Sequence, residues 1–233
     1  MAMKLEQVVP FGRSFDEYVK MFSLSEADLQ KSILSVADGP ASFNAEGTER
    51  GYQIQSIDPL YGFSGKEIRD RFYAVLDGII TQIKATPNDW VWGYHASAEA
   101  LKTHRIEVTE RFYADYEVGK IAGRYRVGEL PTLTDPDDRY ELSLSSHFLF
   151  LYSDQLDAAF HLAAIDEMLR VSPEVRIFPL LTLAQEKSPY LEQAIAHLKA
   201  SGHQCQIEKV GYELQPGGNE MLRICRSSAN RSA

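Results

Sequence analysis

The stretch that most constrains the fold is residues 32–61, in which two apolar β-type runs flank a short helical segment. The first run, Ile33 to Ala37, ends in a tight turn at Gly39, and the second, Tyr52 to Ile57, ends at Asp58. A strand, a turn, a helix and a second strand within about thirty residues have the size of one β-α-β unit. We therefore expect a parallel sheet whose ligand site lies at the carboxyl ends of these strands.

The turn and the acidic residue indicate a nucleotide-type ligand. Gly39 lets the backbone approach a ligand, and the N-terminus of the following helix offers unpaired N–H donors. Asp58, nineteen residues after Gly39, can accept hydrogen bonds from both hydroxyls of a ribose. Of a GxGxxG pattern only Gly39 is present, with Ala41 and Asn44 at the other two positions. An ordinary β-α-β turn without a ligand therefore stays open as the alternative interpretation of this segment.

Length and charge exclude several classes of protein. A chain of 233 residues is long enough for one α/β domain with a sizeable core. The net charge of −9 disfavours nucleic-acid binding, which needs a basic face. The two cysteines, Cys205 and Cys225, have no CxxC spacing, so we expect buried thiols rather than a metal site or disulfides. The sequence has no long apolar segment, so we expect no membrane association and a cytoplasmic location.

The first half of the chain contains three capping boxes, which begin at Ser14, Ser25 and Ser64. They predict two short helices, near 15–22 and 26–31, and a long one that Pro87 closes. A second long helix is predicted from Ala96 to Val118, with Leu101, Val108, Phe112 and Tyr116 on one apolar face.

These two long helices form a predicted helical cap inserted after the second strand, at about 62–123. A crossover between parallel strands needs only about a dozen residues, so this excursion is far longer than the connection requires. An aromatic turn, 89–95, lies between the helices. Tyr61, Trp90 and Trp92 are therefore candidate contacts of an acceptor substrate. Alternatively, these aromatic residues only pin the helices to each other or to a second subunit.

The second half of the chain alternates strands and helices, which is typical of a parallel sheet. The last two strands are joined by only nine residues, too few for a helical crossover, so they should be antiparallel. We expect one α/β domain over residues 1–226 and a disordered tail over 227–233. The predicted elements are strands at 124–130, 140–145, 174–181, 204–210 and 220–226, a helix at 155–171, and a helix that Ser188 and Pro189 begin and Gly202 ends.

Six segments of the chain resemble the class I S-adenosylmethionine-dependent methyltransferase superfamily, in particular an uncharacterised bacterial branch. They are VADGPASFNAE, SIDPLY, SLSSHFLFLYS, FHLAAIDEMLRV, EVRIFPLL and GYELQPGGNEML. The resemblance covers most of the chain outside residues 62–123. It implies a Rossmann-like, mostly parallel seven-stranded sheet in the order 3-2-1-4-5-7-6, with the seventh strand antiparallel. It also implies S-adenosylmethionine as the cofactor.

The resemblance also implies site residues. The loop beneath the methionine part of the cofactor would be Asp38, Gly39, Pro40, Ala41, Ser42 and Phe43. Asp58, followed by Pro59, would hold the ribose hydroxyls, and Leu130 and Pro131 would border the adenine. Ser145, Ser146 and His147 would line the side where the methyl group is transferred.

His147 is the candidate general base, because its ordinary pKa is close to working pH and it follows a strand of the sheet. The alternative is a core histidine that is hydrogen-bonded to the backbone. The sequence Ser-Ser-His-Phe replaces the Asn/Asp-Pro-Pro-aromatic pattern of enzymes that methylate amines or amides, and no acidic cluster indicates a metal.

The leading interpretation is an S-adenosylmethionine-dependent methyltransferase that acts on a small molecule, with a homodimer as one open state of assembly. A non-catalytic module that keeps the fold and the ligand is the alternative. A nicotinamide oxidoreductase is disfavoured by the missing GxGxxG pattern and by the antiparallel pair at the end of the chain.

Overall fold

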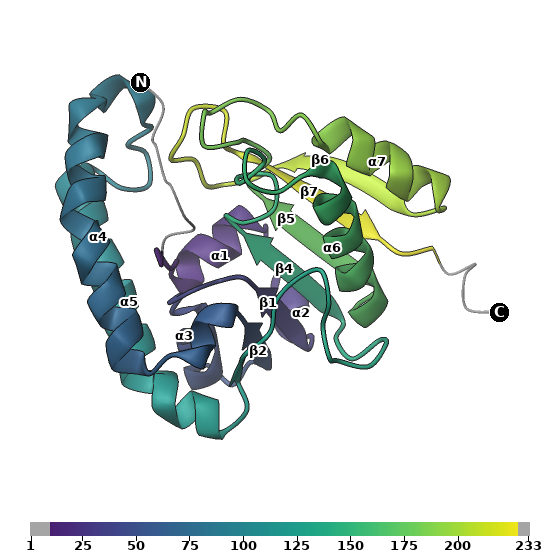
Figure 1. Ribbon diagram of the computed structural model, residues 1–233, viewed down its shortest axis with the longest axis horizontal. Helices are drawn as coiled ribbons and strands as arrows, with labels where there is room; N and C mark the ends of the chain where they lie inside the picture. The colour runs from purple at the N-terminus through teal and green to yellow at the C-terminus, as the bar shows by residue number, and fades with distance from the viewer. Residues whose placement is uncertain (1–9, 228–233) are drawn as a thin grey trace.

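The computed structural model describes residues 10–227, and a seven-stranded sheet forms the centre of this part of the chain (Figure 1). The strand order is β3-β2-β1-β4-β5-β7-β6. Strands β1 to β5 are parallel, whereas β7 is antiparallel to both of its neighbours. The predicted order and the predicted antiparallel end are therefore confirmed. The strands are β1 (Ile33–Val36), β2 (Ile54–Ile57), β3 (Tyr125–Arg126), β4 (Leu142–Ser146), β5 (Glu174–Phe178), β6 (Gln204–Lys209) and β7 (Glu220–Cys225).

Helices cover both faces of this sheet, so the central strands are buried along their whole length. On one face α6 and α7 pack against β1, β5 and β7, and on the other α1 and α3 pack against β1 and β4. Among residues 10–227 no helix is long and apolar enough to cross a membrane. The helices are α1 (Phe15–Met21), α2 (Glu26–Leu29), α3 (Phe43–Glu49), α4 (Gly65–Ala85), α5 (Ala98–Ile121), α6 (Ala158–Val171) and α7 (Leu191–Ala200), with short 3-10 turns at Pro59–Gly62 and Pro87–Asp89.

The three predicted capping boxes are present. In each of them the serine side chain accepts a hydrogen bond from the third helical N–H, and the acidic side chain at that position accepts one from the backbone N–H of the serine. These reciprocal bonds satisfy donors that a helix start otherwise leaves free. They fix where α1, α2 and α4 begin.

Helices α4 and α5 pack side by side and form a hairpin that stands along one edge of the sheet (Figure 1). The upper part of the hairpin has its own apolar core, which includes Phe72, Ile80 and Leu101. At its base Tyr116 is fully buried, and its hydroxyl group shares its one proton between the carbonyl oxygens of Tyr61 (2.9 Å) and Phe63 (3.0 Å). The hairpin is therefore tied to the loop that follows β2.

Several predicted boundaries are wrong, such as the end of the strand predicted at 174–181, which stops at Phe178, and three others have local physical reasons. Strand β3 ends at Arg126 rather than at residue 130, because its partner β2 ends at Ile57. Helix α6 begins at residue 158, where the Asp157 side chain caps the helix by accepting from Phe160 N at 2.8 Å. Helix α7 begins at Leu191 with Tyr190 as its N-cap residue, so Ser188 lies before the helix, where its hydroxyl group accepts from Tyr190 N at 3.3 Å and pairs with the Ser153 hydroxyl at 2.8 Å. Of the predicted tail, residues 228–233 lie outside the described part of the chain.

The tie at the base of the hairpin can be tested with Tyr116→Phe. Loss of the hydroxyl group removes a donor from the Tyr61 and Phe63 carbonyl oxygens, so the free energy of unfolding should fall by about 1–3 kcal/mol. Tyr113→Phe, on the same helix but half-exposed, is the matched control and should change it by less than about 0.5 kcal/mol. Equal effects of the two substitutions in urea denaturation would contradict the role given to Tyr116.

Candidate functional site

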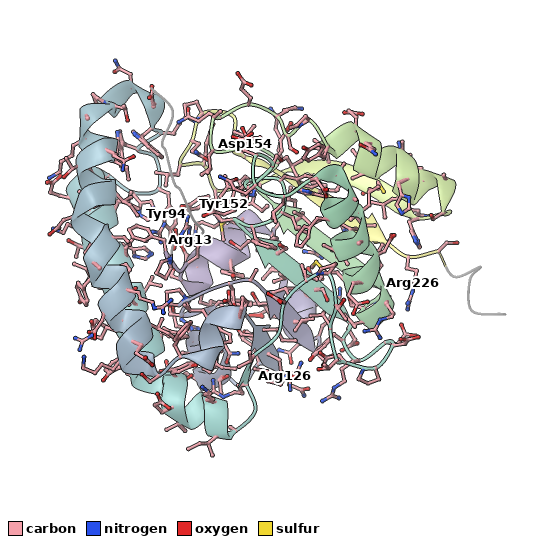
Figure 2. The ribbon with its side chains drawn as sticks, in the orientation of Figure 1. Arg13, Tyr94, Arg126, Tyr152, Asp154 and Arg226 are labelled. Carbon is pink, nitrogen blue, oxygen red and sulfur yellow. The ribbon has the colours of Figure 1, made fainter. Side chains whose placement is uncertain are left out.

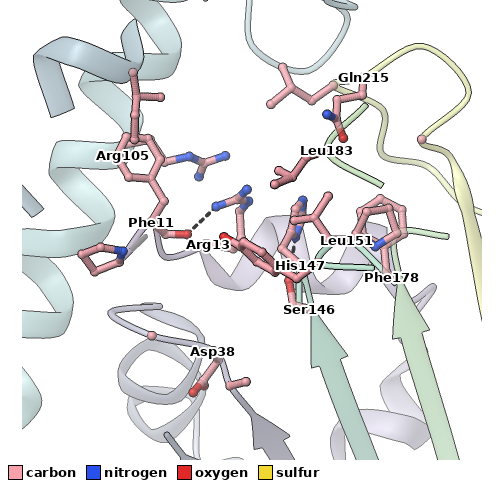
Figure 3. A pocket seen from close by; sticks show the side chains of 18 of the residues that line it. Phe11, Arg13, Asp38, Arg105, Ser146, His147, Leu151, Phe178, Leu183 and Gln215 are labelled. Atoms are coloured by element: carbon pink, nitrogen blue, oxygen red, sulfur yellow. Dashed lines mark hydrogen bonds between the residues drawn. The ribbon is translucent and has the colours of Figure 1, made fainter. Parts of the chain in front are cut away.

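A cavity of about 370 Å³ lies between the carboxyl ends of the central strands and the α4–α5 hairpin (Figure 3). This volume is within the range of small-molecule sites, which are about 300–1,000 Å³. The floor is formed by the residues that follow β1, β2, β4 and β5, and the walls by the hairpin and the loop between β6 and β7. The cavity is therefore at the edge of the sheet where the sequence predicts a ligand.

The backbone is unusual where two of these strands end. Ala37 and Gly39 after β1, and His147 after β4, all have left-handed backbones, with φ between 54° and 55°. Side chains other than glycine rarely adopt this conformation, so it is strained at Ala37 and His147. All three residues line the cavity. Such strain concentrates at functional sites, which supports a binding role for this edge.

Asp58 holds the turn after β1 in place. One of its carboxylate oxygens accepts from Gly39 N at 2.9 Å, and the other accepts from Leu60 N at 2.7 Å. Burial raises the pKa of Asp58, although these two N–H groups favour the charged form. Each carboxylate oxygen has a second lone pair, so both can still accept a hydrogen bond from a ligand in the cavity.

Asp38 is the second acidic residue of the cavity floor, and buried hydroxyl groups contact its carboxyl group. Its two oxygens lie 2.7 Å from the Ser56 hydroxyl and 2.8 Å from the Tyr61 hydroxyl. Tyr61 also lies 2.8 Å from the carbonyl oxygen of Gly39. A phenol has one proton and cannot donate fully to both acceptors, so a proton on Asp38 completes the network. Burial and the charge of Asp58 raise the pKa of Asp38 to about 7, which agrees with this arrangement.

The segment before α1 packs directly on the turn after β1. A side chain at Gly12 would collide with Pro40 O, which is 2.1 Å from the position of its first carbon atom. The Ser42 N–H donates to Arg13 O at 3.1 Å. This close contact carries the Arg13 side chain into the cavity. Figure 2 shows Arg13 between the hairpin and the sheet, whereas Arg226 lies at the periphery.

Behind the cavity, Glu17 is the centre of a buried polar cluster. Its carboxylate accepts two hydrogen bonds from Arg105, at 2.6 and 2.7 Å, and one from the Tyr212 hydroxyl at 2.9 Å. His95 and His104 contact it at 3.3 and 3.2 Å. Burial opposes ionisation, but the charge of Arg105 and these hydrogen bonds outweigh it and hold the pKa of Glu17 well below its ordinary value. Glu17 therefore stays charged.

His147 lies in the cavity beside two arginines. Its Nδ1 atom is 2.9 Å from the Ser146 hydroxyl, and its backbone N–H donates to Phe178 O at 2.7 Å. Burial, together with the charges of Arg13 and Arg105, lowers the pKa of His147 well below its ordinary value. At neutral pH the imidazole is therefore uncharged and only weakly basic.

Seven of the predicted site residues line the cavity and nine do not. Phe43 is buried in the core, where its ring stacks on Tyr18 with 4.2 Å between ring centres. Leu130 is in the core beneath α6, Pro131 is exposed, and Tyr61 is buried under Asp38 rather than open to a substrate. Those that line the cavity are Asp38, Gly39, Asp58, Pro59, Trp90, Ser146 and His147, and those that do not are Pro40, Ala41, Ser42, Phe43, Tyr61, Trp92, Leu130, Pro131 and Ser145.

The aromatic turn contributes to the core of the hairpin and to the wall of the cavity, while its contact with an acceptor stays a prediction. Trp90 belongs to the apolar core of the hairpin and also lines the cavity, whereas Trp92 only packs against that core. The backbone N–H of Val91 donates to Leu214 O at 2.8 Å and joins the turn to the loop between β6 and β7.

Sequence reasoning missed Arg13, Glu17, Arg105 and Tyr212. Arg105 had a detectable signal, because it falls between Leu101 and Val108 on the apolar face of α5. An arginine on a buried face needs a partner, so a carboxylate should have been sought. Within residues 10–227 no group of His, Cys, Asp and Glu side chains is arranged to hold a metal ion.

Comparison with known sequences finds one close similarity. An uncharacterised protein of the archaeon Methanocaldococcus jannaschii is 38% identical over 225 residues, which cover 96% of this chain and 99% of that protein. A scan against families of known proteins finds no match. The similar protein is archaeal, so the predicted bacterial branch stays a prediction.

Two solved structures illustrate the more distant similarities. Magnesium protoporphyrin IX methyltransferase from Synechocystis, solved with bound S-adenosylmethionine, has a TM-score of 0.48 and 12% identity, covering 91% of this chain and 78% of its own. A putative S-adenosylmethionine-dependent methyltransferase from Methanococcus maripaludis has a TM-score of 0.47 and 11% identity, covering 94% and 85%. Because these scores are low, the assignment of the fold rests on the strand order and directions of this chain.

The raised pKa of Asp38 predicts a pH-dependent stability. In the folded state this carboxyl group keeps its proton up to about pH 7, whereas in the unfolded chain it loses it near its ordinary value of 3.8. The folded state therefore binds more protons over this window, and its stability falls as the pH rises through it.

Asp38→Asn has no such titration, and its amide can accept from Ser56 and donate to Tyr61. Its melting temperature should therefore rise relative to the wild type between pH 5 and pH 8, by an amount equivalent to a few kcal/mol at most. Melting curves that stay parallel for the two proteins across this range would show that Asp38 is ionised in the folded state at all of these pH values.

Proposed function

We propose that this protein, which belongs to the same family as the Methanocaldococcus jannaschii protein and has the class I methyltransferase fold, is an S-adenosylmethionine-dependent methyltransferase. The observation that carries the proposal is the hydrogen bond from Gly39 N to Asp58. It joins the turn after β1 to the acidic end of β2 on the floor of the cavity. In sheets of this kind a nucleotide binds at this edge.

In the proposed complex, the free lone pairs of Asp58 accept hydrogen bonds from the ribose hydroxyls. The methionine part of the cofactor lies over Gly39, where no side chain blocks the backbone. Leu130 and Pro131 stay the proposed border of the adenine, although neither lines the cavity in the structure. Ser146 and His147, after β4, then face the sulfonium methyl group.

Methyl transfer from a sulfonium is a direct displacement, so the protein mainly aligns the acceptor with the methyl carbon and excludes water. The hairpin is placed for this role, because Ile79, Ile83 and Leu101 line the cavity. His147, as a weak base between two arginines, suits an acceptor that needs little help to lose a proton.

The low basicity of His147 is also the observation that favours the alternative, a module that binds the cofactor without transferring its methyl group. The two functions differ in what happens to bound S-adenosylmethionine. The nature of the acceptor, a small molecule rather than a nucleic acid, and a homodimeric assembly belong to the proposal. The cytoplasmic location is part of it as well.

Calorimetric titration with S-adenosylmethionine, S-adenosylhomocysteine and NAD tests the proposal. We expect the first two to bind with one site per chain and NAD not to bind. Binding of NAD alone would point to the nicotinamide oxidoreductase instead. Formation of S-adenosylhomocysteine during incubation with a pool of small molecules would separate the enzyme from the non-catalytic module.

Asp58→Asn should weaken the binding of S-adenosylhomocysteine by about 10- to 150-fold, since a hydrogen bond to a charged group contributes about 1.5–3 kcal/mol. Asp38→Asn is the matched control in the same cavity, because Asp38 is held by Ser56 and Tyr61 on the side away from the cavity and the amide of Asn can keep both contacts. It should change the affinity little. Unchanged affinity of a folded Asp58→Asn protein would remove Asp58 from the ribose site.

The proposed cap predicts a pattern of hydrogen exchange. At a ligand concentration of about 100 Kd, S-adenosylhomocysteine stabilises the whole fold by about 2.7 kcal/mol. Residues 60–96 should gain protection of up to this amount, because opening of a cap over the ligand would release the ligand. Unchanged exchange across residues 60–96 would show that the hairpin does not respond to the ligand.

A further inference from the structure

The upper part of the cavity carries more positive than negative charge. Arg13 and Arg105 both line it, and the charge of Arg105 lowers the pKa of Arg13 in addition to the effect of burial. Glu17 neutralises Arg105 through two short hydrogen bonds, but it lies 4.0 Å from the nearest nitrogen of Arg13. One carboxylate is therefore the counter-charge of two guanidinium groups.

Arg13 is the member of the pair whose hydrogen bonds are incomplete. Its Nη1 atom donates to the carbonyl oxygens of Phe11 and Gly12, which carry no charge. Its Nε atom is buried and has no hydrogen-bond partner among residues 10–227. Only 12% of the side chain is exposed. A buried charge that shares its counter-charge with a second guanidinium group and leaves one N–H without a partner is costly, so this side chain fits a site that an anion completes.

The walls around this charged end are apolar. Ile79, Ile83 and Leu101 come from the hairpin, and Leu151 and Leu183 come from the loops after β4 and β5. Figure 3 shows the Arg13 and Arg105 side chains near His147 and Leu183, and Asp38 apart from them at the tip of β1. An occupant of the upper part therefore meets an apolar surface that ends in a guanidinium group.

The two ends of the cavity have opposite charge. Asp58 lies on the floor, where the proposed function puts the ribose, and its carboxylate would repel an anion there. Arg13 lies beside His147, where the proposed function puts the transferred methyl group. This separation distinguishes an acceptor region from the nucleoside region.

We propose that the methyl acceptor is an apolar molecule that carries a carboxylate, and that Arg13 binds this carboxylate with Arg105 behind it. The proposal rests on the proposed function, since it assigns the acceptor of that same site. A planar guanidinium binds a carboxylate through two parallel hydrogen bonds, which fixes orientation as well as affinity. It would hold the acceptor at its anionic end and leave the rest of the molecule against the apolar walls, next to His147.

The cofactor itself has a carboxylate, which is the second source of such an anion. If Arg13 bound the carboxylate of the cofactor instead, its loss would lower the affinity for ligands that carry the amino-acid part. The affinity for ligands without that part would not change. S-Adenosylhomocysteine and 5′-methylthioadenosine differ in this part. A comparison of the two therefore identifies the source.

The test uses 1-naphthoate as an apolar carboxylate and 1-naphthamide as its uncharged match, each titrated by fluorescence with and without S-adenosylhomocysteine. Arg13→Gln should weaken the binding of naphthoate by about 10- to 150-fold and leave the affinity for naphthamide unchanged. Arg13→Lys, which keeps the charge but not the fork of donors, should recover part of the loss. Arg71→Gln is the control, because Arg71 lines the same cavity but is exposed and stacked on Phe63 at 3.7 Å.

Four results would overturn the proposal. Naphthoate and naphthamide could respond equally to Arg13→Gln, Arg71→Gln could weaken naphthoate as much as Arg13→Gln, or neither probe could bind. A loss of affinity for S-adenosylhomocysteine but not for 5′-methylthioadenosine in Arg13→Gln would also overturn it and assign Arg13 to the cofactor. If neither adenosine ligand binds the wild type, the proposed function fails, while the naphthoate titration without cofactor still decides whether Arg13 binds a carboxylate.

Discussion

The buried carboxylate of Glu17 holds together the parts of the chain that enclose the cavity. It lies on α1, Arg105 on α5, His95 in the aromatic turn and Tyr212 after β6, so one charged group joins four separate segments. Removing one partner of a buried ion pair leaves the other charge without compensation, which makes such a cluster intolerant of partial loss. The hairpin is therefore fixed to the sheet by a polar contact beside the cavity as well as by its own apolar core.

This construction explains how one cavity has two chemically different ends. The lower end is built from the turn after β1 and the end of β2, where backbone N–H groups and Asp58 organise each other. The upper end is built from segments that are distant in the sequence, namely the stretch before α1, the hairpin and the loop after β6. The left-handed backbones of Ala37 and His147 place strained residues in the cavity lining, where β1 and β4 end.

The sequence predicts the sheet and the lower end of the cavity well because both depend on local patterns. Alternating strands and helices determine the parallel order, the nine-residue connection determines the antiparallel end, and Gly39 and Asp58 belong to one β-α-β unit. The upper end depends on long-range contacts. Arg13 and Glu17 come together with Arg105 only after folding, since about 88 residues separate Glu17 from Arg105. Tyr61 was misjudged for a similar reason, because an aromatic residue after a strand can face a ligand or support the turn from below.

The most direct measurement is a crystal structure of the protein with S-adenosylhomocysteine. The account predicts the ribose hydroxyls within hydrogen-bonding distance of both Asp58 oxygens, the sulfur atom on the side of Ser146 and His147, and Arg13 still free to bind an anion. A ligand whose adenosine part lies among the apolar residues of the hairpin, with no contact between its ribose and Asp58, would contradict it.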